Sequence, residues 1–417
     1  MNGSALANEG TTLPAMEARS VPVKIVHLIS DLSTGGAEIM LFRLLSHVDQ
    51  VRFQNVVISL HDRGTLGNGI EALGVRVYTL TNHRDSESNS VGFWRFLSLV
   101  LFGLWKLVAV LKKEKPAILQ TWLYHSDLIG LIAGKLASVP AIVWNLRCTK
   151  LKSDRALAMR LLAKLSGYPE RVLVNSSAGL RFHESKGYHP KKWILVPNGF
   201  DVERFRPDPT ACRKVRGDLG IPEDAFAIGL IARFDPLKDH GNFFSAARKL
   251  LEHRNDIHFV LAGLGTDPAN RNLMADINAL GLQSHVHLLG ERQDMPVVMS
   301  ALDILTSSSS AEGFPNVVGE AMACAVPCVV TDVGDSALLV GETGKVVPPK
   351  NPILLAQAWL ELIEMDREKR VQLGEAARKR IQERFNILSV VKEYERCYEE
   401  LAAVGTEKAH EPTASTT

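Results

Sequence analysis

The sequence predicts an α/β protein of two doubly wound domains, and three observations support this fold class. Short apolar runs rich in β-forming residues alternate with helix-length segments through both halves of the chain. The alternation breaks once, in a polar stretch with three prolines at 205–222, and residues 352–401 read as almost continuous helix. Strands separated by helix-length segments favour parallel sheets covered by helices. The length of 417 residues also suits two domains of about 200 residues each.

The expected strands are apolar runs bounded by turn residues. In the first half of the chain they are residues 23–29, 55–60, 75–80, 117–121, 141–146, 171–175 and 193–196. In the second half they are residues 226–232, 258–262, 285–288, 304–307, 327–331 and 345–347. We therefore expect a disordered leader at 1–22, a first domain at 23–205, a second domain at 206–385, a helix at 386–403 that packs back on the first domain, and a disordered tail at 404–417.

The composition argues against several classes of protein. A formal net charge of +2 gives no basic footprint, so we expect no nucleic-acid partner. Five scattered cysteines without zinc-like spacing indicate reduced thiols and a cytoplasmic location. The chain does not start with basic residues followed by an apolar core, so we expect no signal peptide. The longest uncharged apolar run, residues 96–105, is shorter than the roughly 18 residues that span a bilayer.

The most informative stretch is residues 311–334, AEGFPNVVGEAMACAVPCVVTDVG. Glu312 and Glu320 lie eight residues apart, and Pro315 between them suits the first turn of a helix, where its missing N–H has no intrahelical partner. Free amides and the positive dipole end at such a helix start form a natural diphosphate site. Because a diphosphate repels carboxylates, we expect the two glutamates to face hydroxyl groups on either side of it. The alternative is a buried strand–turn–helix whose glutamates only cap and solvate.

Two cations lie where a diphosphate would need them. Arg233 and Lys238 follow one expected strand and precede a helix, although taken alone they would fit a solvated loop equally well. A guanidinium and an ammonium group commonly neutralise a leaving diphosphate. The chain contains no Asp-any-Asp pair and no clustered His/Cys set, so we expect no metal ion and no other cofactor. Gly35 and Gly36, after the first expected strand, would let the backbone approach a ligand closely.

Taken together, these residues resemble the retaining GT-B glycosyltransferases of family four, over roughly residues 23–401. The matching features are the two-glutamate motif at Glu312 and Glu320, the diphosphate-binding pair at Arg233 and Lys238, the interdomain segment at 198–201 and, more loosely, Gly35-Gly36 and residues 122–125. The resemblance implies two Rossmann-like domains with a cleft between them, the first on the acceptor side and the second binding the nucleotide sugar. It also implies retaining transfer from a UDP- or GDP-sugar to a saccharide acceptor, in polysaccharide or glycoconjugate biosynthesis.

The resemblance further implies roles for individual residues. Glu312 would contact hydroxyls of the transferred sugar, Glu320 the ribose, and His125 the transferred sugar or the acceptor. Arg233 and Lys238 would stabilise charge on the leaving diphosphate, in a front-face displacement without a protein nucleophile. The other donor contacts would come from Gly35, Gly36, Gly290, Arg292, Gly313, Phe314, Pro315 and Asn316. The sequence departs from the family's pattern at two positions where glycine is usual, Ala325 and Asp335, which puts helix packing and the donor loop in question.

A basic stripe marks a strongly apolar segment at 91–113. Arg95, Lys106 and Lys113 would lie within about 20° of one another around a helix. A basic stripe on an apolar helix is typical of an interfacial membrane helix, and a domain-core helix with one wet stripe is the alternative. If the helix binds an anionic membrane surface, we expect a lipid-linked acceptor of the polyprenyl type and a peripheral position on the inner face of the plasma membrane.

Two other functions would use similar residues. A GT-B nucleotide-sugar epimerase would bind the same donors without an acceptor, and a non-catalytic protein would only bind the sugar nucleotide. The spacing within the glutamate pair and within the cation pair argues against an epimerase. The complete set of Gly36, Arg233, Lys238, Glu312 and Glu320 argues against a protein that has lost activity.

Overall fold

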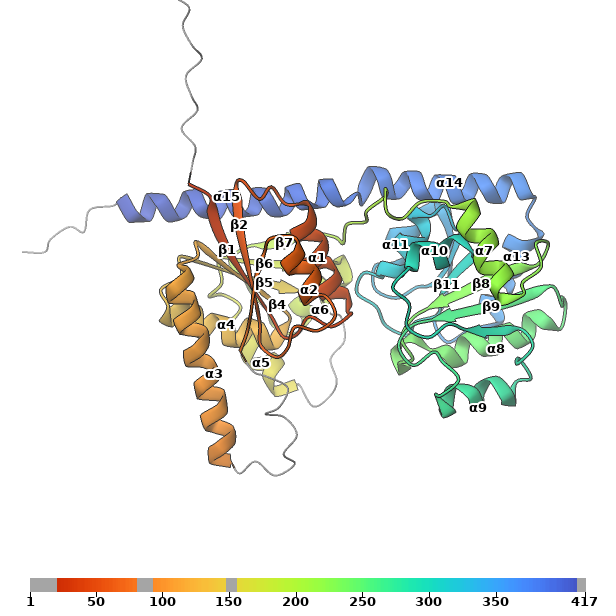
Figure 1. Ribbon diagram of the computed structural model, residues 1–417, viewed down its shortest axis with the longest axis horizontal. Coiled ribbons are helices and arrows are strands. Elements are labelled where there is room, and N and C mark those ends of the chain that lie inside the picture. The colour runs from red at the N-terminus through yellow and green to blue at the C-terminus, as the bar shows by residue number, and fades with distance from the viewer. Residues whose placement is uncertain (1–20, 81–92, 148–155, 411–417) are drawn as a thin grey trace, which may run out of the picture.

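The computed structural model describes residues 21–80, 93–147 and 156–410, without the side chains of 93–101, 156–157 and 404–410. The expected leader therefore falls almost entirely outside the described residues. Two domains lie side by side, each a parallel sheet flanked by helices, and the C-terminal helices run along one side of both (Figure 1). This arrangement confirms the predicted fold class.

The first domain contains a seven-stranded parallel sheet of order β3-β2-β1-β4-β5-β6-β7. Its strands are β1 (Val23–Ile29), β2 (Phe53–Ser59), β3 (Arg76–Thr79), β4 (Ile118–Trp122), β5 (Ala141–Leu146), β6 (Arg171–Val174) and β7 (Trp193–Leu195). Its helices are α1 (Gly36–His47), α2 (Gly67–Ala72), α3 (Phe93–Glu114), α4 (Tyr124–Leu136), α5 (Ala156–Leu165) and α6 (Ser177–Ser185). The strand order reverses between β1 and β4, which are hydrogen-bonded neighbours.

The second domain contains a six-stranded parallel sheet of order β10-β9-β8-β11-β12-β13. Its strands are β8 (Phe226–Ile231), β9 (Ile257–Ala262), β10 (Val286–Leu288), β11 (Ile304–Ser307), β12 (Cys328–Thr331) and β13 (Gly344–Val347). Its helices are α7 (Pro209–Leu219), α8 (His240–Leu251), α9 (Arg271–Ala279), α10 (Met295–Ser300), α11 (Asn316–Ala323), α12 (Ser336–Val340), α13 (Pro352–Glu364) and α14 (Arg367–Arg384). Here the order reverses between β8 and β11.

Helix α7 shows how local sequence sets the elements of this domain. Asp208 caps the helix by accepting from the amides of Thr210 and Ala211, and Pro209 occupies the first turn, where no N–H is needed. Gly220 ends the helix in the left-handed conformation that glycine adopts without steric cost. The proline-rich stretch that we used as a domain boundary is therefore the start of a helix.

The chain crosses between the domains twice, at neighbouring points. Phe200 bonds through its backbone to Phe385 and Ile387, on either side of a parallel bridge with Asn386. Phe200, Val202 and Phe205 already pack in the core of the second domain, so the first crossing lies before position 205, where we divided the chain.

Helix α15 (Ile387–His410) returns to the first domain after the second crossing. Val390, Val391, Tyr394 and Tyr398 are buried there against strands and helix α1. The helix extends to His410, so residues 404–410 are helical, whereas we expected a disordered tail to begin at 404.

Ala325 ends helix α11 in the left-handed conformation, with φ of 58°. The amide of Ala325 donates to the carbonyl of Met322, and that of Val326 to the carbonyl of Ala321, which together form a Schellman motif. The alanine thus stands where we expected glycine without displacing the helix end. An alanine in this conformation costs roughly 1–2 kcal/mol.

We expect Ala325→Gly to stabilise the protein by about 0.5–1 kcal/mol, because relief of the strain exceeds the entropy that glycine adds to the unfolded chain. The matched control is Ala376→Gly at an exposed position within α14, which should destabilise by about 1 kcal/mol. Urea denaturation of the two variants beside the parent measures both effects. Destabilisation by both substitutions would contradict the argument.

Candidate functional site

The candidate site lies where both sheets reverse their strand order. Ligands of doubly wound proteins bind outside the carboxyl ends of the strands at such a point. In the first domain, Gly35 and Gly36 follow β1 and His125 follows β4. In the second, residues 233–238 follow β8 and residues 308–316 follow β11. The topology therefore collects most of the predicted donor residues at the reversal points of the two sheets.

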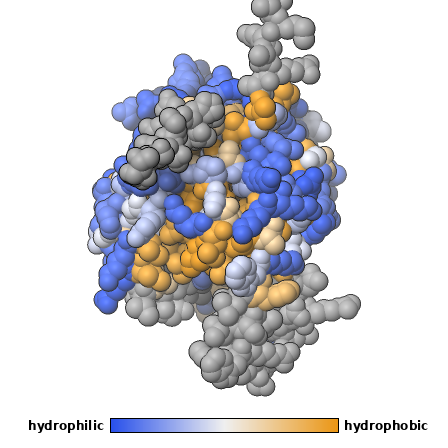
Figure 2. All heavy atoms as spheres, turned by 90° about the vertical axis from the view of Figure 1, so that its left-hand side faces the viewer, coloured by the Kyte–Doolittle hydropathy of each residue, from blue (hydrophilic) through white to orange (hydrophobic). Residues whose placement is uncertain are grey.

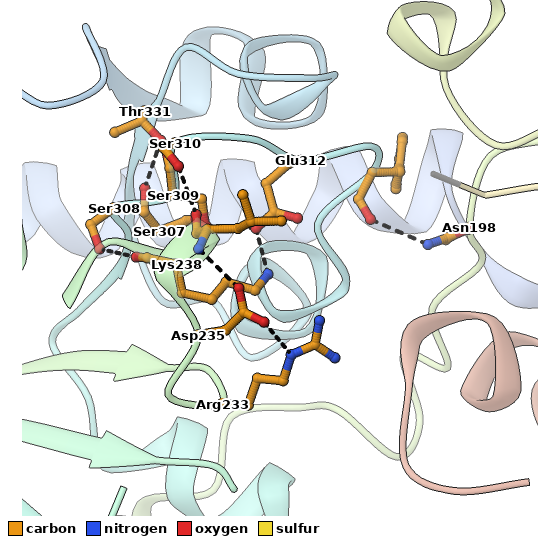
Figure 3. A network of polar contacts seen from close by, with 12 residues as sticks. Asn198, Arg233, Asp235, Lys238, Ser307, Ser308, Ser309, Ser310, Glu312 and Thr331 are labelled. Carbon is orange, nitrogen blue, oxygen red and sulfur yellow. Dashed lines mark hydrogen bonds and ion pairs between the residues drawn. The ribbon is translucent and has the colours of Figure 1, made fainter. Parts of the chain in front are cut away.

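The loops after β8 and β11 are joined by hydrogen bonds (Figure 3). The Lys238 Nζ atom lies 2.5 Å from Glu312 Oε1, which also accepts from the Ser309 hydroxyl at 2.6 Å. The Ser308 hydroxyl donates to the Lys238 carbonyl, and the Ser310 amide to the Leu237 carbonyl. The structure thus places the predicted sugar-contacting glutamate directly against one of the two predicted phosphate-binding cations.

Arg233, the second predicted cation, is the more exposed of the two. Its Nε donates to Asp235 at 3.3 Å, and 57% of its side chain is exposed. Asp235 also accepts from the Leu237 amide and thereby caps the short 3-10 helix Pro236–Lys238. Figure 3 shows the far end of the guanidinium directed away from this loop. The planar fork is therefore accessible for an anion.

Contacts across the domain boundary hold the start of α11 against the start of α1. Asn316 donates from its side chain to the Gly36 carbonyl at 3.4 Å. Asn198, in the segment between the domains, donates to the Asn316 side chain at 2.7 Å and to the Phe314 carbonyl at 3.4 Å. Pro315 is the N-cap residue of α11, so the helix starts one residue later than a proline in the first turn would imply.

Glu320 is buried in an ion pair with Arg43 of the other domain. Arg43 also donates to the Gly199 carbonyl at 3.0 Å and lies over the rings of Phe200 and Phe205. We did not predict this partner, because Arg43 stands in the apolar pattern of α1. The contact with ribose that we expected for Glu320 stays a prediction.

The other predicted residues are more scattered. Gly290 has φ of 63° and bonds through its backbone to the neighbouring turn at Gly263 and Thr266. Arg292 is bonded to Asp294 at the surface. His125 lies exposed on the first turn of α4.

The predicted basic stripe lies on α3. Lys106 donates to the carbonyls of Thr79 and Leu80, and Lys113 lies over the ring of Tyr78. The side chain of Arg95 falls outside the described residues. Among the helices that the structure describes, none is long and apolar enough to cross a bilayer.

Glu38 is a residue of the site that we did not predict. It lies in the first turn of α1, is 8% exposed, and a Cβ atom on Gly35 would approach its Oε2 to 2.2 Å, so Gly35 makes its position possible. Burial, together with the charge of Asp31, raises its pKa from 4.5 to about 7. Its own backbone amide and the charges of Arg147 and Arg233 act in the opposite direction. The single acidic residue after the glycine pair was the sequence signal for it.

Arg147 links several parts of the first domain beside the site. Its guanidinium bonds to the side chains of Asn145, Asn198 and Tyr394 and lies 5.3 Å from the centroid of the Trp122 ring. Arg147 follows β5, a strand that the sequence predicted. Its partners come from that strand, the interdomain segment and α15. No pattern in the sequence joins them.

The structure offers no grouped metal ligands within its described parts. No set of three or more His, Cys, Asp or Glu side chains there is arranged to hold an ion. The four described cysteines, Cys212, Cys324, Cys328 and Cys397, are not in disulfides.

Comparisons with known families agree with this geometry. The model of "Glycosyltransferase Family 4" matches residues 34–204, and that of "Glycosyl transferases group 1" matches residues 213–380. The two matches correspond to the two domains and together cover most of the chain. The chain therefore belongs to the group 1, family-four glycosyltransferases and has their GT-B fold.

Individual relatives carry the same activity in their names. A putative glycosyltransferase EpsF of Bacillus subtilis is 27% identical, over 74% of this chain and 79% of its own length. A UDP-Gal:alpha-D-GlcNAc-diphosphoundecaprenol alpha-1,3-galactosyltransferase of Escherichia coli is 26% identical, over 73% of this chain and 81% of its own. The crystal structure of Anabaena HepE with UDP-glucose is similar in fold, with a TM-score of 0.79, 23% identity, and coverage of 90% of this chain and 99% of that one.

The raised pKa of Glu38 predicts a pH-dependent stability. The folded-state pKa of Glu38, about 7, exceeds the unfolded value of 4.5. The contribution of Glu38 to the free energy of unfolding is therefore complete below pH 4.5 and is lost as the pH rises through 7. The free energy of unfolding of the parent, measured relative to that of Glu38→Gln, should fall by on the order of 3 kcal/mol between pH 4.5 and pH 8. Thermal and urea unfolding across this range measure the difference, with the exposed Glu375→Gln as control. A difference that does not change with pH would contradict the assignment.

Proposed function

We propose that this glycosyltransferase transfers a sugar, with retention at the anomeric carbon and without a metal ion, from a UDP-sugar to a lipid-linked saccharide. Uridine is preferred to guanosine here because relatives named for a UDP-sugar, or solved with one, cover most of the chain. The chain would act in the synthesis of a polysaccharide or glycoconjugate, from the cytoplasmic side of a membrane.

The observation that carries this proposal is the placement of Arg233, Lys238 and Glu312 at the strand reversal of the second sheet. Two cations within one loop can neutralise the two charges of a diphosphate. Glu312, held between Lys238 and Ser309, can turn to the hydroxyls of a bound sugar when the phosphate takes over the ammonium group. A cation pair of this kind supplies charge stabilisation that a metal supplies elsewhere.

The reaction is a substitution at the anomeric carbon. The acceptor oxygen forms the new glycosidic bond on the face from which the phosphate oxygen leaves, and the leaving phosphate oxygen takes the acceptor's proton. The products are the glycoside and the nucleoside diphosphate. Arg233 and Lys238 stabilise the charge that grows on the diphosphate, the effect that is usually largest in catalysis.

The domain boundary supports the same donor orientation. Gly36 and Asn316 meet there, so a diphosphate at the start of α11 would also meet the backbone at the start of α1. Arg43 orients the Glu320 carboxylate inside the same boundary, which suits recognition of a ribose diol. His125 remains the proposed contact on the acceptor side.

The acceptor side of the first domain carries exposed apolar residues. Figure 2 shows apolar side chains gathered in the middle of one face, with hydrophilic side chains around them. Neighbouring helices α3, α4 and α5 expose Phe102, Trp105, Ile132, Leu136 and Leu161. The same helices expose Lys112, Lys135, Arg160 and Lys164. Apolar residues among basic ones suit an anionic bilayer surface, where a lipid-linked acceptor would be presented.

Transfer from a UDP-sugar should survive chelation, because the proposed phosphate charge is met by Arg233 and Lys238. We expect initial rates in excess EDTA to stay within about twofold of those without it. Glu312→Gln serves as the control for contaminating activity, since its turnover should fall about 100-fold while UDP, which Lys238 binds, is retained. Complete loss in EDTA, restored by magnesium or manganese, would refute the metal-free reaction. Absence of both transfer and UDP binding in the parent would refute the proposed donor.

Membrane attachment should depend on the exposed apolar residues of α3 more than on Lys106, whose ammonium group is bonded to the domain itself. The double variant Phe102→Ser/Trp105→Ser should bind vesicles containing phosphatidylglycerol at least about tenfold more weakly in sedimentation. The matched control, Ile353→Ser/Val371→Ser, removes two similarly exposed apolar residues from the second domain and should bind as the parent does. Equal vesicle binding by all three proteins would show that α3 does not bind the membrane and is only a helix of the domain.

A further inference from the structure

Asp335, one of the two positions where the family resemblance led us to expect glycine, forms a contact between the domains. Asp335 immediately precedes α12 of the second domain and is 5% exposed. One carboxylate oxygen accepts from the Ser177 amide at 2.6 Å, and the other accepts from the Ala178 amide at 2.8 Å. Ser177 and Ala178 are the first two residues of α6 in the first domain.

The contact provides hydrogen-bond acceptors for the first amides of helix α6, and these acceptors come from the other domain. The first amides of a helix have no intrahelical acceptor, and the local cap residue, Ser176, accepts only from Gly179. A carboxylate placed on the first two amides completes the cap and faces the positive end of the helix dipole. Asp335 makes no side-chain cap for α12, the helix that it precedes. Its side chain therefore serves the other domain and not its own.

The backbone of Asp335 is attached to the donor loop. Its amide donates to the Gly313 carbonyl at 2.9 Å, next to Glu312. Gly334 has φ of 61°, and a Cβ atom there would lie 2.4 Å from the Glu312 carbonyl oxygen. The turn at 334–335 thus packs against the donor loop without space between them. One residue connects that loop through its amide and the first domain through its carboxylate.

We propose that Asp335 is a positioning residue, a latch that holds the two domains closed and ties that closure to the donor loop. The proposal rests on the proposed function, because it takes the loop at 312–316 to bind the nucleotide sugar. A donor bound between the domains requires the closed arrangement, so its apparent affinity falls with the fraction of protein that is closed. Loss of the latch lowers that fraction without altering any donor contact.

The latch can be broken from either domain. Asp335→Ala removes the carboxylate. Ser177→Pro removes one donating amide at the first position of α6, where proline is well tolerated. Ser176, the preceding residue, already has the extended backbone that a following proline requires. The matched control is Asp366→Ala, which removes a similar cap, on the amides of Glu368 and Lys369, within the second domain.

We expect Asp335→Ala to weaken UDP binding on the order of tenfold in titration calorimetry, and Ser177→Pro to weaken it by a smaller factor. The double variant should bind UDP no more weakly than Asp335→Ala, because both substitutions break the same contact. The KM for the donor should rise while kcat at saturating donor changes little. In small-angle scattering without UDP, both variants should have a larger radius of gyration, and Asp366→Ala should match the parent.

Parent-like scattering and UDP binding by Asp335→Ala would overturn the latch. So would losses in UDP binding that simply add in the double variant, or an equal loss of UDP binding in Asp366→Ala. If Ser177→Pro does not fold, the comparison of UDP binding and scattering between Asp335→Ala and Asp366→Ala still tests the latch. Failure of the parent to bind UDP would contradict the proposed function, while scattering without ligand would still report on the latch.

Discussion

The way the two domains meet at the crossing segment depends on one buried charge. Arg43 is 5% exposed, and its guanidinium is satisfied by the Gly199 carbonyl and by Glu320 of the other domain. Removing one partner of such a pair typically costs about 3–5 kcal/mol, because the remaining charge stays buried. Phe200 lies over the same guanidinium and packs against α11, where a side chain on Gly319 would collide with its ring. The crossing segment, α1 and α11 therefore have to meet in one way.

The charges at this junction are paired with one another. Lys238 is bonded to Glu312, Arg233 to Asp235, and Arg43 to Glu320. In the proposed function, donor binding at Lys238 would be an exchange, in which phosphate replaces the Glu312 carboxylate and that carboxylate is released toward the sugar. Such an exchange would keep the site organised before the substrate arrives, which would favour electrostatic stabilisation of the transition state. Glu320, whose partner comes from the other domain, is set apart from this exchange.

The sequence was sufficient for the fold and for the residues that follow neighbouring strands of one sheet. Strands such as β1 and β8 are apolar runs between turn residues, and the order of strands and helices implied the two sheets. Arg233, Lys238 and Glu312 converge because they follow neighbouring strands of one parallel sheet, a relation that strand order alone contains. The end of the first domain was less well placed. Phe200 lies in an irregular segment without hydrophobic periodicity, so only packing decides which domain core the segment joins.

Residues that act across the domain boundary could not be found in this way, and the two unusual positions show why. Ala325 and Asp335 both stand where the family resemblance led us to expect glycine, and both looked like local disturbances. For Ala325 the consequence is local, because the Schellman hydrogen bonds hold the helix end whatever the side chain. For Asp335 the consequence lies 157 positions away in sequence, on the amide of Ala178. A departure from a pattern marks a position, but its meaning depends on the surface that the fold brings against it.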